Sequence, residues 1–307
     1  MIEEIKVVNK RTEKSITMGT DSRYDYIVPQ GGFDFGAVEA DHTTFAYPGQ
    51  VGSFISNTKL GNRSFSVFGY VVGTESDIKR KKRLLSDFMN PFDEIEIQAE
   101  GYSLYGKPES NVHFGKEYAD NNSVLCKFLI DILCNKPLFE ESKSNEVALA
   151  ILTAAFHFPL TIVPSVKNGG VIFGKRRKEL FSEVVNDGAV EVGIEVYLHA
   201  TGIVNNPQIT FVEQNTFFRI NKVLQEGEEI KLSTIDGERF IRGRLSEADP
   251  YESYLDYWDE NSTWLKFPIG KTTVGFKTKL NGVEDDTYKN LEVLITYKKK
   301  KYNLDGE

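Results

Sequence analysis

The side chains that could do chemistry are few and scattered along the 307-residue sequence. The histidines are His42, His113, His157 and His199, and no two of them stand at the spacing of a metal-binding pair. The sequence contains no HExxH motif, no CxxC motif, no GxSxG nucleophile elbow and no phosphate-binding glycine loop. We therefore expect no catalytic residue, no cofactor and no metal site, and a protein that is not an enzyme.

One pair of carboxylates could serve a glycosidase, because that chemistry needs only an acid and a nucleophile. Glu191 and Glu195 are four residues apart on a predicted strand, so they share a face at a separation of about 13 Å. A glycosidase pair lies about 5–10 Å apart. Valine and isoleucine alternate with both glutamates, which places them on the solvent face of the strand. An enzyme that acts on polysaccharide is therefore the least favoured hypothesis.

An acidic, aromatic-rich segment lies at residues 251–264, with the sequence YESYLDYWDENSTW. Such a loop can stack on sugar rings or chelate a cation, although its acidic residues lack the spacing of an EF-hand. The candidate sugar or partner surface consists of Tyr254, Tyr257, Trp258 and Trp264.

The composition is that of a globular protein without a dominant basic face. The chain is 40% hydrophobic and 27% charged, with a formal net charge of −8. This acidic balance argues against a dedicated nucleic-acid-binding protein. No stretch approaches the roughly eighteen apolar residues of a membrane span, so no membrane partner is expected. The first residues also lack the apolar region of a signal peptide.

The two cysteines, Cys126 and Cys134, exclude a disulfide scaffold and a four-cysteine zinc site. On one strand they would share a face but lie about 26 Å apart, which is too far for a disulfide. We expect two buried, apolar thiols and synthesis in a reducing, intracellular compartment.

Most of the chain has the two-residue periodicity of β-strands. Residues 64–71 form one such strand, and residues 94–99 and 102–105 are predicted to form a hairpin. Residues 124–133 are predicted to form a strand buried on both faces, which Pro137 should end because proline cannot donate to the ladder.

One helix is predicted before residue 140. Thr74 can cap it, Asp77 stands three residues later as in a capping box, and Asn90-Pro91 ends it. A localisation signal or a phosphate-binding patch could use its basic cluster. We expect instead a solvated or interface face whose long side chains cover apolar surface. The basic residues proposed for the interface are Lys79, Arg80, Lys82 and Arg83.

Residues 36–52 form a long segment without clear periodicity. A stretch of this length inside a compact domain often marks a functional arm or a partner contact. Its residues Phe45, Tyr47 and Val51 would be unfavourable in solvent, so we expect a neighbouring subunit or the same chain to cover them. The arm and the basic helix together are the candidate subunit interface.

The length predicts two domains, and the polar residues that follow Phe139 mark the boundary. We expect an N-terminal domain at residues 1–140, a connecting segment at 141–165 with a linking helix near 147–156, and a second domain at 166–307.

Turn signals at strand spacing predict a two-sheet β-sandwich or jelly roll for the second domain. Residues 229–233 and 239–242 form a predicted hairpin, and residues 291–297 form the last predicted strand. The lysines at 298–301 could contact nucleic acid or an acidic partner, or they could protect an exposed edge strand from aggregation. A β-rich chain without a catalytic constellation is typical of an assembly component.

Several segments, taken in order, resemble the distal tail protein (Dit) family of long-tailed phages, also called the siphovirus tail component family. The N-terminal half carries a glycine-ended strand at 63–73, a helix at 78–91, a hairpin at 95–106 and a closing strand at 124–139. The C-terminal half carries the family's turns at Asn206-Pro207, Gly227-Glu228 and Asp236-Gly237, then Trp264 followed by Pro268-Ile269-Gly270. Each motif is common, but their order and spacing are more specific, and they cover most of the chain.

This resemblance implies a mainly β fold, with an N-terminal β-sandwich belt domain that has one α-helix and a C-terminal galectin-like β-sandwich. The belt would close into a hexameric ring that joins the tail tube protein to the tail-tip protein. The outer domains would carry receptor-binding or baseplate proteins, and DNA would pass through the ring without specific binding. The protein would be made in the bacterial host cytoplasm and located in the virion, at the tail tip of a phage or prophage. Galectin-like names a fold, and sugar binding does not follow from it.

A second hypothesis stays open from the residues themselves. The chain could be a lectin-like adhesion module whose second domain binds host cell-wall sugars through its aromatic surface. Glycan binding would favour that module, and ring assembly would favour the tail hub.

Overall fold

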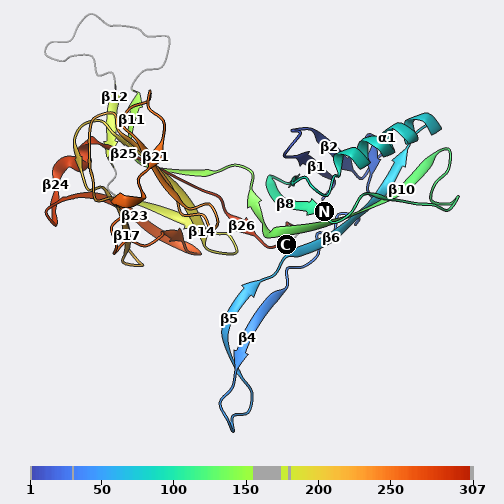
Figure 1. Ribbon diagram of the computed structural model, residues 1–307, viewed down its shortest axis with the longest axis horizontal. Helices are drawn as coiled ribbons and strands as arrows, with labels where there is room; N and C mark the ends of the chain where they lie inside the picture. The colour runs from blue at the N-terminus through green and yellow to red at the C-terminus, as the bar shows by residue number, and fades with distance from the viewer. Residues whose placement is uncertain (1, 30, 155–173, 179–180, 305–307) are drawn as a thin grey trace, which may run out of the picture. The chain divides into compact units, whose positions relative to one another are not determined.

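The computed structural model describes residues 2–29, 31–154, 174–178 and 181–304. The chain divides into two compact units, an N-terminal unit of Met1–Lys143 with Lys300–Glu307 and a C-terminal unit of Ser144–Lys299. Strands dominate both units, and the described residues contain one α-helix (Figure 1). These features confirm the predicted mainly β fold class. Within the described ranges, no helix is both long and apolar enough to cross a membrane.

The N-terminal unit is built around one sheet that closes on itself. Its strands follow the order β26-β10-β6-β3-β2-β1-β7-β8, and β8 pairs again with β10. The two halves of the curled sheet therefore face each other across a core, and the long strand β10 joins them at one side. The strands are β1 (Glu4–Asn9), β2 (Ser15–Gly19), β3 (Tyr26–Ile27), β6 (Arg63–Val72), β7 (Ile95–Ala99), β8 (Tyr102–Pro108), β9 (His113–Phe114), β10 (Leu125–Glu141) and β26 (Lys300–Lys301).

Strand β10 continues past Pro137, where the sequence predicted its end. It pairs with β6 as far as Cys134 and pairs with β26 from Phe139. Pro137 lies between these two paired regions and beside register shifts in the pairing with β8, so its missing N–H is tolerated. The predicted burial on both faces is also wrong, because mainly alternate residues of the strand face the core.

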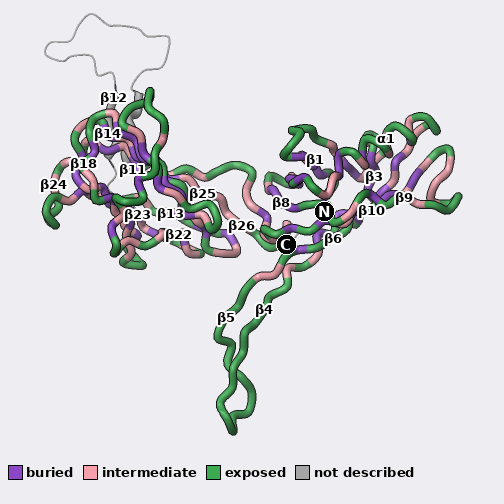
Figure 2. The backbone as a smooth tube through the Cα atoms, viewed as in Figure 1, coloured by how far each residue is buried: buried purple, intermediate pink, exposed green. Residues whose placement is uncertain are grey.

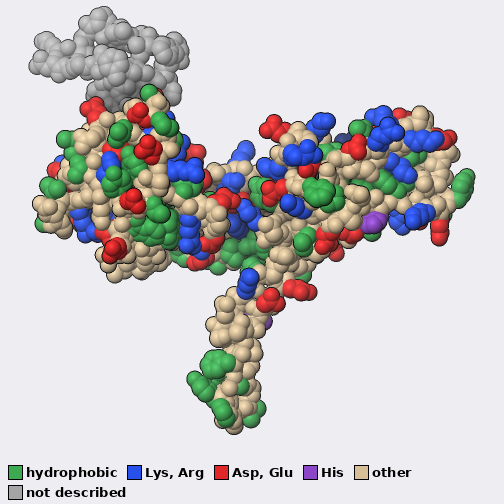
Figure 3. All heavy atoms as spheres, in the orientation of Figure 1, with side chains coloured by type: hydrophobic (Ala, Val, Ile, Leu, Met, Phe, Trp, Pro, Cys, Tyr) green, Lys and Arg blue, Asp and Glu red, His purple; other side chains and the backbone are tan. Residues whose placement is uncertain are grey.

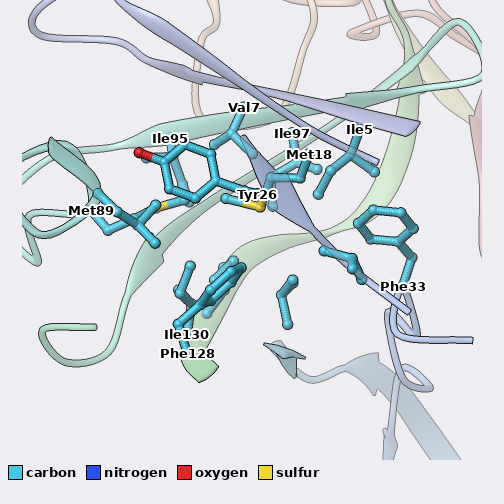
Figure 4. Close-up of a cluster of buried hydrophobic side chains, with 14 of the residues drawn as sticks. Ile5, Val7, Met18, Tyr26, Phe33, Met89, Ile95, Ile97, Phe128 and Ile130 are labelled. Atoms are coloured by element: carbon cyan, nitrogen blue, oxygen red, sulfur yellow. The ribbon is translucent and has the colours of Figure 1, made fainter. Parts of the chain in front are cut away.

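Aliphatic and aromatic side chains fill the interior of the curled sheet (Figure 4). Ile5 and Val7 of β1, Ile97 of β7 and Phe128 of β10 are all buried. Tyr26 packs edge to face against Phe128, with ring centroids 6.2 Å apart. Burial of such side chains stabilises the unit by about 1.5–3 kcal/mol each.

Helix α1 (Glu75–Phe88) confirms the predicted helix and its cap. Thr74 and Asp77 form a capping box in which each side chain accepts a hydrogen bond from the other residue's backbone N–H, both at 3.4 Å. Ile78 and Leu85 lie on one face of the helix and are buried in the core.

The C-terminal unit is a sandwich of two sheets. The larger sheet has the order β12-β11-β25-β14-β19-β20-β21 with β22 beside β14, and the smaller has the order β13-β23-β16-β17 with β24 beside β23. The larger sheet contains β12 (Gly174–Lys178), β11 (Asn145–Ala154), β25 (Leu291–Tyr297), β14 (Val192–Ala200), β19 (Glu229–Ser233), β20 (Phe240–Arg244), β21 (Glu252–Ser253) and β22 (Lys266–Phe267). The smaller contains β13 (Phe181–Asn186), β23 (Gly270–Leu280), β16 (Gln208–Phe211), β17 (Thr216–Arg219) and β24 (Val283–Asp285).

Short elements complete the unit: the bridge pair β15 (Val204–Asn205) and β18 (Val223–Leu224), and the 3-10 helices η1 (Leu255–Tyr257) and η2 (Asp286–Asn290). The core receives side chains from both sheets, for example Val196 and Ile295 from the larger and Val274 from the smaller. Phe211 and Phe267 stack with ring centroids 4.9 Å apart.

The expected connecting segment at 141–165 and its helix near 147–156 are wrong where the structure describes them. Asn145–Ala154 is strand β11, which pairs with β25 and β12 in the larger sheet. Leu149 is buried in the core, and Val147 packs against it from the same face, so the two-residue period of a strand decides the structure. Residues 155–173, which include His157, lie outside the described residues.

The expected second domain at 166–307 also loses its last residues to the N-terminal unit. After β25, the predicted last strand, the chain forms β26 at the edge of the N-terminal sheet, where Lys300 and Lys301 pair with Glu140 and Phe139. Two lysines on an edge strand fit the predicted protection against aggregation. Leu304 then packs against the N-terminal core.

Candidate assembly interface

The predicted arm is a two-stranded hairpin of β4 (Ala40–Phe45) and β5 (Phe54–Leu60) that projects from the N-terminal unit (Figure 1). The two strands pair with each other and, among the described strands, with no other. Every residue of β4 is exposed, as is nearly all of β5 (Figure 2). The lack of clear periodicity therefore does not mean a lack of strands here, because Thr, Phe and Ile give both strands β propensity without a buried face to impose alternation.

The outer part of the hairpin is uncharged, although 27% of the chain is charged. Residues 42–58 contain no Asp, Glu, Lys or Arg. Charged atoms mark the base of the hairpin, and apolar side chains gather at its tip (Figure 3). Natural proteins usually protect exposed strand edges with charges, proline or bulges. This hairpin has one register irregularity, between Thr43 and Thr44, but no charge along its outer edges.

Aromatic side chains form a small cluster at the tip. The ring of Phe45 lies 5.3 Å from that of Tyr47 and 5.7 Å from that of Phe54, measured between centroids. The cluster stays open to solvent, since Tyr47 is 63% exposed and Val51 is fully exposed. No described residue of this unit covers the tip, so cover from within the unit is absent there. An isolated two-stranded hairpin is marginally stable, and an exposed apolar patch of this kind marks an interaction site.

The root of the hairpin, in contrast, is firmly packed. Phe35, before β4, contacts Phe65 of β6 and Phe139 of β10, with ring centroids 5.1 Å apart in both cases. Arg63 follows β5 and is fully buried, with its guanidinium 4.9 Å from the ring of Phe139. Its Nη2 donates to the backbone carbonyl of Tyr302 in the C-terminal segment. The hairpin is thus a projecting element on a fixed base.

The basic residues of α1 are mostly engaged within the chain. Lys79 pairs with Glu75 at 2.7 Å, and Arg80 lies 3.8 Å from Asp77. The ammonium group of Lys82 lies over the ring of Phe114, 4.8 Å from its centroid. Arg83 is exposed, and no carboxylate lies within ion-pair distance of it among the described residues. Among the described basic residues of this helix face, only Arg83 therefore has neither a carboxylate nor an aromatic ring as a partner.

Lys81 is the best-anchored cation of this helix. Its ammonium group lies 2.8 Å from an oxygen of Asp25 and donates to the carbonyl of Val72 at 2.9 Å. Its side chain is only 12% exposed, so it holds α1 onto the sheet and is not available to a partner.

The structure does not bring the four candidate aromatic residues of the C-terminal unit onto one open surface. Tyr254 is 7% exposed and belongs to the core. Lys222 lies over the ring of Tyr257 at 5.5 Å. Trp258 and Trp264 meet edge to face at 4.2 Å and pack against the same core. Burial of Tyr254 removes one of the four side chains from the surface that the lectin-like hypothesis requires.

The other candidate acidic residues are either exposed or engaged in ion pairs within the chain. Glu191 and Glu195 are exposed, as predicted, and Glu191 pairs with Lys266 at 3.2 Å. Asp259 is buried against Arg219 at 2.8 Å. Among the described residues, no three His, Cys, Asp or Glu side chains converge as a metal ion would require.

The cysteines are free and buried on the inner face of β10, as predicted. Burial raises the pKa of the Cys134 thiol to about 12, so the reactive thiolate is not populated at neutral pH. Two of the described histidines make ordinary contacts: His42 hydrogen-bonds Thr58 at 2.9 Å and His113 hydrogen-bonds Ser110 at 3.0 Å.

No protein-family model matches the sequence, and no curated protein matches it significantly. Solved structures do match. The crystal structure of SPP1 Dit (gp 19.1), described as a paradigm of hub adsorption apparatus in Gram-positive infecting phages, aligns with a TM-score of 0.62 and 13% identity. The alignment covers 96% of this chain and 98% of SPP1 Dit.

Two further matches are baseplate structures. Chains of the phage P2 baseplate in its activated conformation, with Ca and with Sr, align with TM-scores of 0.44 and 0.41 at 10% identity. They cover 97% and 96% of this chain, respectively, and 98% of each matched chain.

The fold is that of a two-unit, mainly β protein with a projecting hairpin and a C-terminal segment that returns to the first unit. Because the SPP1 Dit alignment spans both units, this chain has the fold of a phage Dit protein. The sequence resemblance is thereby confirmed at the level of the fold.

Proposed function

We propose that this chain is a structural hub of a bacteriophage or prophage tail tip, a distal tail protein. The observation that carries the proposal is the fold shared with SPP1 Dit over nearly the whole of both chains. The uncharged outer part of the projecting hairpin supports it, because such a surface suits permanent burial in an assembly. A structural role needs no bond-making chemistry, in keeping with a chain proposed not to be an enzyme.

In this proposal the N-terminal unit acts as the belt that closes a hexameric ring. A ring uses heterologous contacts, so each subunit must present two different surfaces. The hairpin tip, with Phe45, Tyr47 and Val51, is one of them. The face of α1 that carries Lys79, Arg80, Lys82 and Arg83 is the proposed second surface, with Arg83 as the cation open to an acidic group of the next subunit.

The ring would join the tail tube protein to the tail-tip protein and allow DNA to pass without specific binding. The galectin-like C-terminal unit would carry receptor-binding or baseplate proteins on the outside of the ring. The protein would be made in the bacterial host cytoplasm and would reside in the virion at the tail tip.

The test uses the full chain expressed together with the tail proteins of its own gene cluster. Mass measurement of the purified assembly should give a ring of six copies. Val51→Asp should prevent ring formation while leaving the monomer folded, because Val51 is fully exposed and supports no core contact. Val283→Asp, at a 71% exposed site in the C-terminal unit, is the matched control and should still assemble.

Assembly of Val51→Asp at the wild-type level would overturn the assignment of the hairpin. Absence of any ring from the wild-type chain in the presence of its tail partners would overturn the hub proposal itself.

A further inference from the structure

A groove of about 470 Å³ lies beside β20 in the C-terminal unit, and nothing in the hub proposal uses it. Its wall residues include Arg239, Arg242, Leu255, Trp258 and Trp264. All of them come from one unit and from one stretch of chain, so the shape of the groove is set locally.

The groove lies at one edge of the larger sheet, where the strand pairing is short. Strand β21 is the last strand on this side, and it pairs with β20 only at Arg242–Ser253 and Gly243–Glu252. The backbone N–H of Tyr254 adds one bond to the carbonyl of Ile241, and the chain then turns away into η1. A short edge strand beside a hollow can accept an extended peptide through main-chain hydrogen bonds.

Two cations at this edge, Lys231 and Arg242, lack carboxylate partners among the described residues, whereas Arg239 pairs with Asp236 at 2.5 Å. Lys231 and Arg242 stand directly opposite each other on β19 and β20, a like-charge pair that destabilises a sheet. Neither has a carboxylate within ion-pair distance in the described part of the chain, whereas their neighbour Arg244 is neutralised by Glu229 at 2.6 Å. Lys231 lies beside the groove and does not line it: its ammonium group is 4.7 Å from the ring of Tyr251, which is a lining residue. An acidic ligand would relieve this repulsion.

The apolar walls suit aliphatic side chains better than sugar rings. The guanidinium of Arg239 already lies over the ring of Trp264 at 5.6 Å, and Trp258 meets Trp264 edge to face. Leu255 is 51% exposed at the rim. The Nε1 of Trp258 is buried and has no acceptor among the described residues.

We propose that this groove binds an extended acidic segment of a partner protein, with its carboxylates on Lys231 and Arg242 and its aliphatic side chains against Leu255 and the two tryptophans. The segment adds to the β20–β21 edge of the sheet. The proposal goes beyond the hub role and does not require a ring, so the two can fail separately.

The sequence supplies the readout, because its only two tryptophans are Trp258 and Trp264. The probe is a synthetic peptide of alternating Glu and Val, titrated into the full chain at low ionic strength while tryptophan fluorescence is recorded. Binding should shift or quench the emission and should weaken as salt is added. A peptide of alternating Lys and Val should produce no change.

Charge-reversal variants distinguish specific binding at the groove from nonspecific electrostatic attraction to the protein. Lys231→Glu and Arg242→Glu should each lower the affinity for the acidic peptide about tenfold or more. The double variant should bind the Lys-Val peptide instead. Lys271→Glu makes the same change of net charge on the smaller sheet, away from the groove, and should bind the acidic peptide as the wild type does.

Three results would overturn the proposal. They are no fluorescence response to the acidic peptide, equal binding by the wild type and the double variant, or a response to chitohexaose with none to the peptide. The last result would restore a sugar-binding function for this unit.

Discussion

Asp93 ties together the start of the N-terminal unit and the end of α1. It accepts hydrogen bonds from Arg11 at 2.6 Å and from Asn9 at 2.8 Å, and Asn9 also donates to the carbonyl of Phe88. These bonds, first from Arg11 and then from Asn9, hold the pKa of the Asp93 carboxyl below its usual value.

A depressed pKa gives the folded state an advantage at neutral pH that acid removes. The stabilisation is complete above the pKa of an unfolded aspartate, about 3.9, and is lost as pH falls through the folded-state pKa. Asp93→Asn should therefore lower the unfolding temperature at pH 7, and the difference from wild type should shrink in acid. Thermal unfolding followed by circular dichroism across this range measures it. A difference that grows in acid would contradict this account.

Arg63 is buried, yet only one of its three guanidinium nitrogens has a hydrogen-bond partner among the described residues. Burial lowers the pKa of this guanidinium, which reflects the unfavourable desolvation of its charge. Replacing a poorly satisfied buried charge with an apolar residue of similar length is often neutral or stabilising.

We expect the free energy of unfolding of Arg63→Met to be higher than that of wild type or at most about 1 kcal/mol lower. Arg63→Ala should be less stable than Arg63→Met by about 2–4 kcal/mol, because the cavity beside Phe139 stays unfilled. Urea denaturation of the three proteins measures both differences. A large loss of stability in Arg63→Met would show that the bond to Tyr302 outweighs the desolvation of the charge.

At the residue scale, sequence predicts side-chain type but not burial within a loop. The segment 251–264 displays its aromatics without alternation, so nothing in it distinguishes Tyr254, a core residue, from the half-exposed Trp258. A signal lies in Gly243, where any Cβ would stand 2.2 Å from the ring of Tyr254. The need for glycine at this position is visible only when the pairing of β20 with β21 is known. The groove beside β20 could not be predicted from the sequence because it depends on the same pairing.

Helix α1 is the element that the sequence predicts best, because residues adjacent in sequence determine where it starts. Thr74 and Asp77 specify the cap, and Pro91 prevents continuation. Thr74→Ala should cost about 1 kcal/mol of stability in urea denaturation, since a backbone N–H loses its acceptor. Ser86→Ala, inside the same helix, is the control and should change stability by less than about 0.5 kcal/mol. Equal losses in both variants would contradict the role of the cap.

Strands depend on partners that are distant in sequence, and the element errors follow from this. Pro137 is tolerated because β6 stops pairing before it and β26 starts after it. Residues 145–154 form a strand because β25 and β12 flank them, although their short apolar run also fits a helix. The hairpin at 40–60 shows no alternation because neither of its faces is buried by the described residues of its unit.

At the scale of the whole molecule, the C-terminal segment belongs to the N-terminal unit, and sequence offers no signal for this return. Residues 300–304 add β26 to the sheet, cover Arg63 and place Leu304 on the core. A chain ended after Lys299 should therefore lose hydrogen-exchange protection in β6 and β10 while β14 and β19 of the C-terminal unit keep theirs. Unchanged protection in β10 would show that the segment is dispensable.

The central claim is that this chain works by shape, as a ring-forming hub at the tip of a phage tail. Cryo-electron microscopy of particles assembled from its own tail gene cluster tests this most directly. We predict six copies in a ring between tube and tip, with Tyr47 and Val51 of each hairpin buried against a neighbouring subunit. A tail tip without this chain, or a ring whose hairpin tips remain in solvent, would contradict the account.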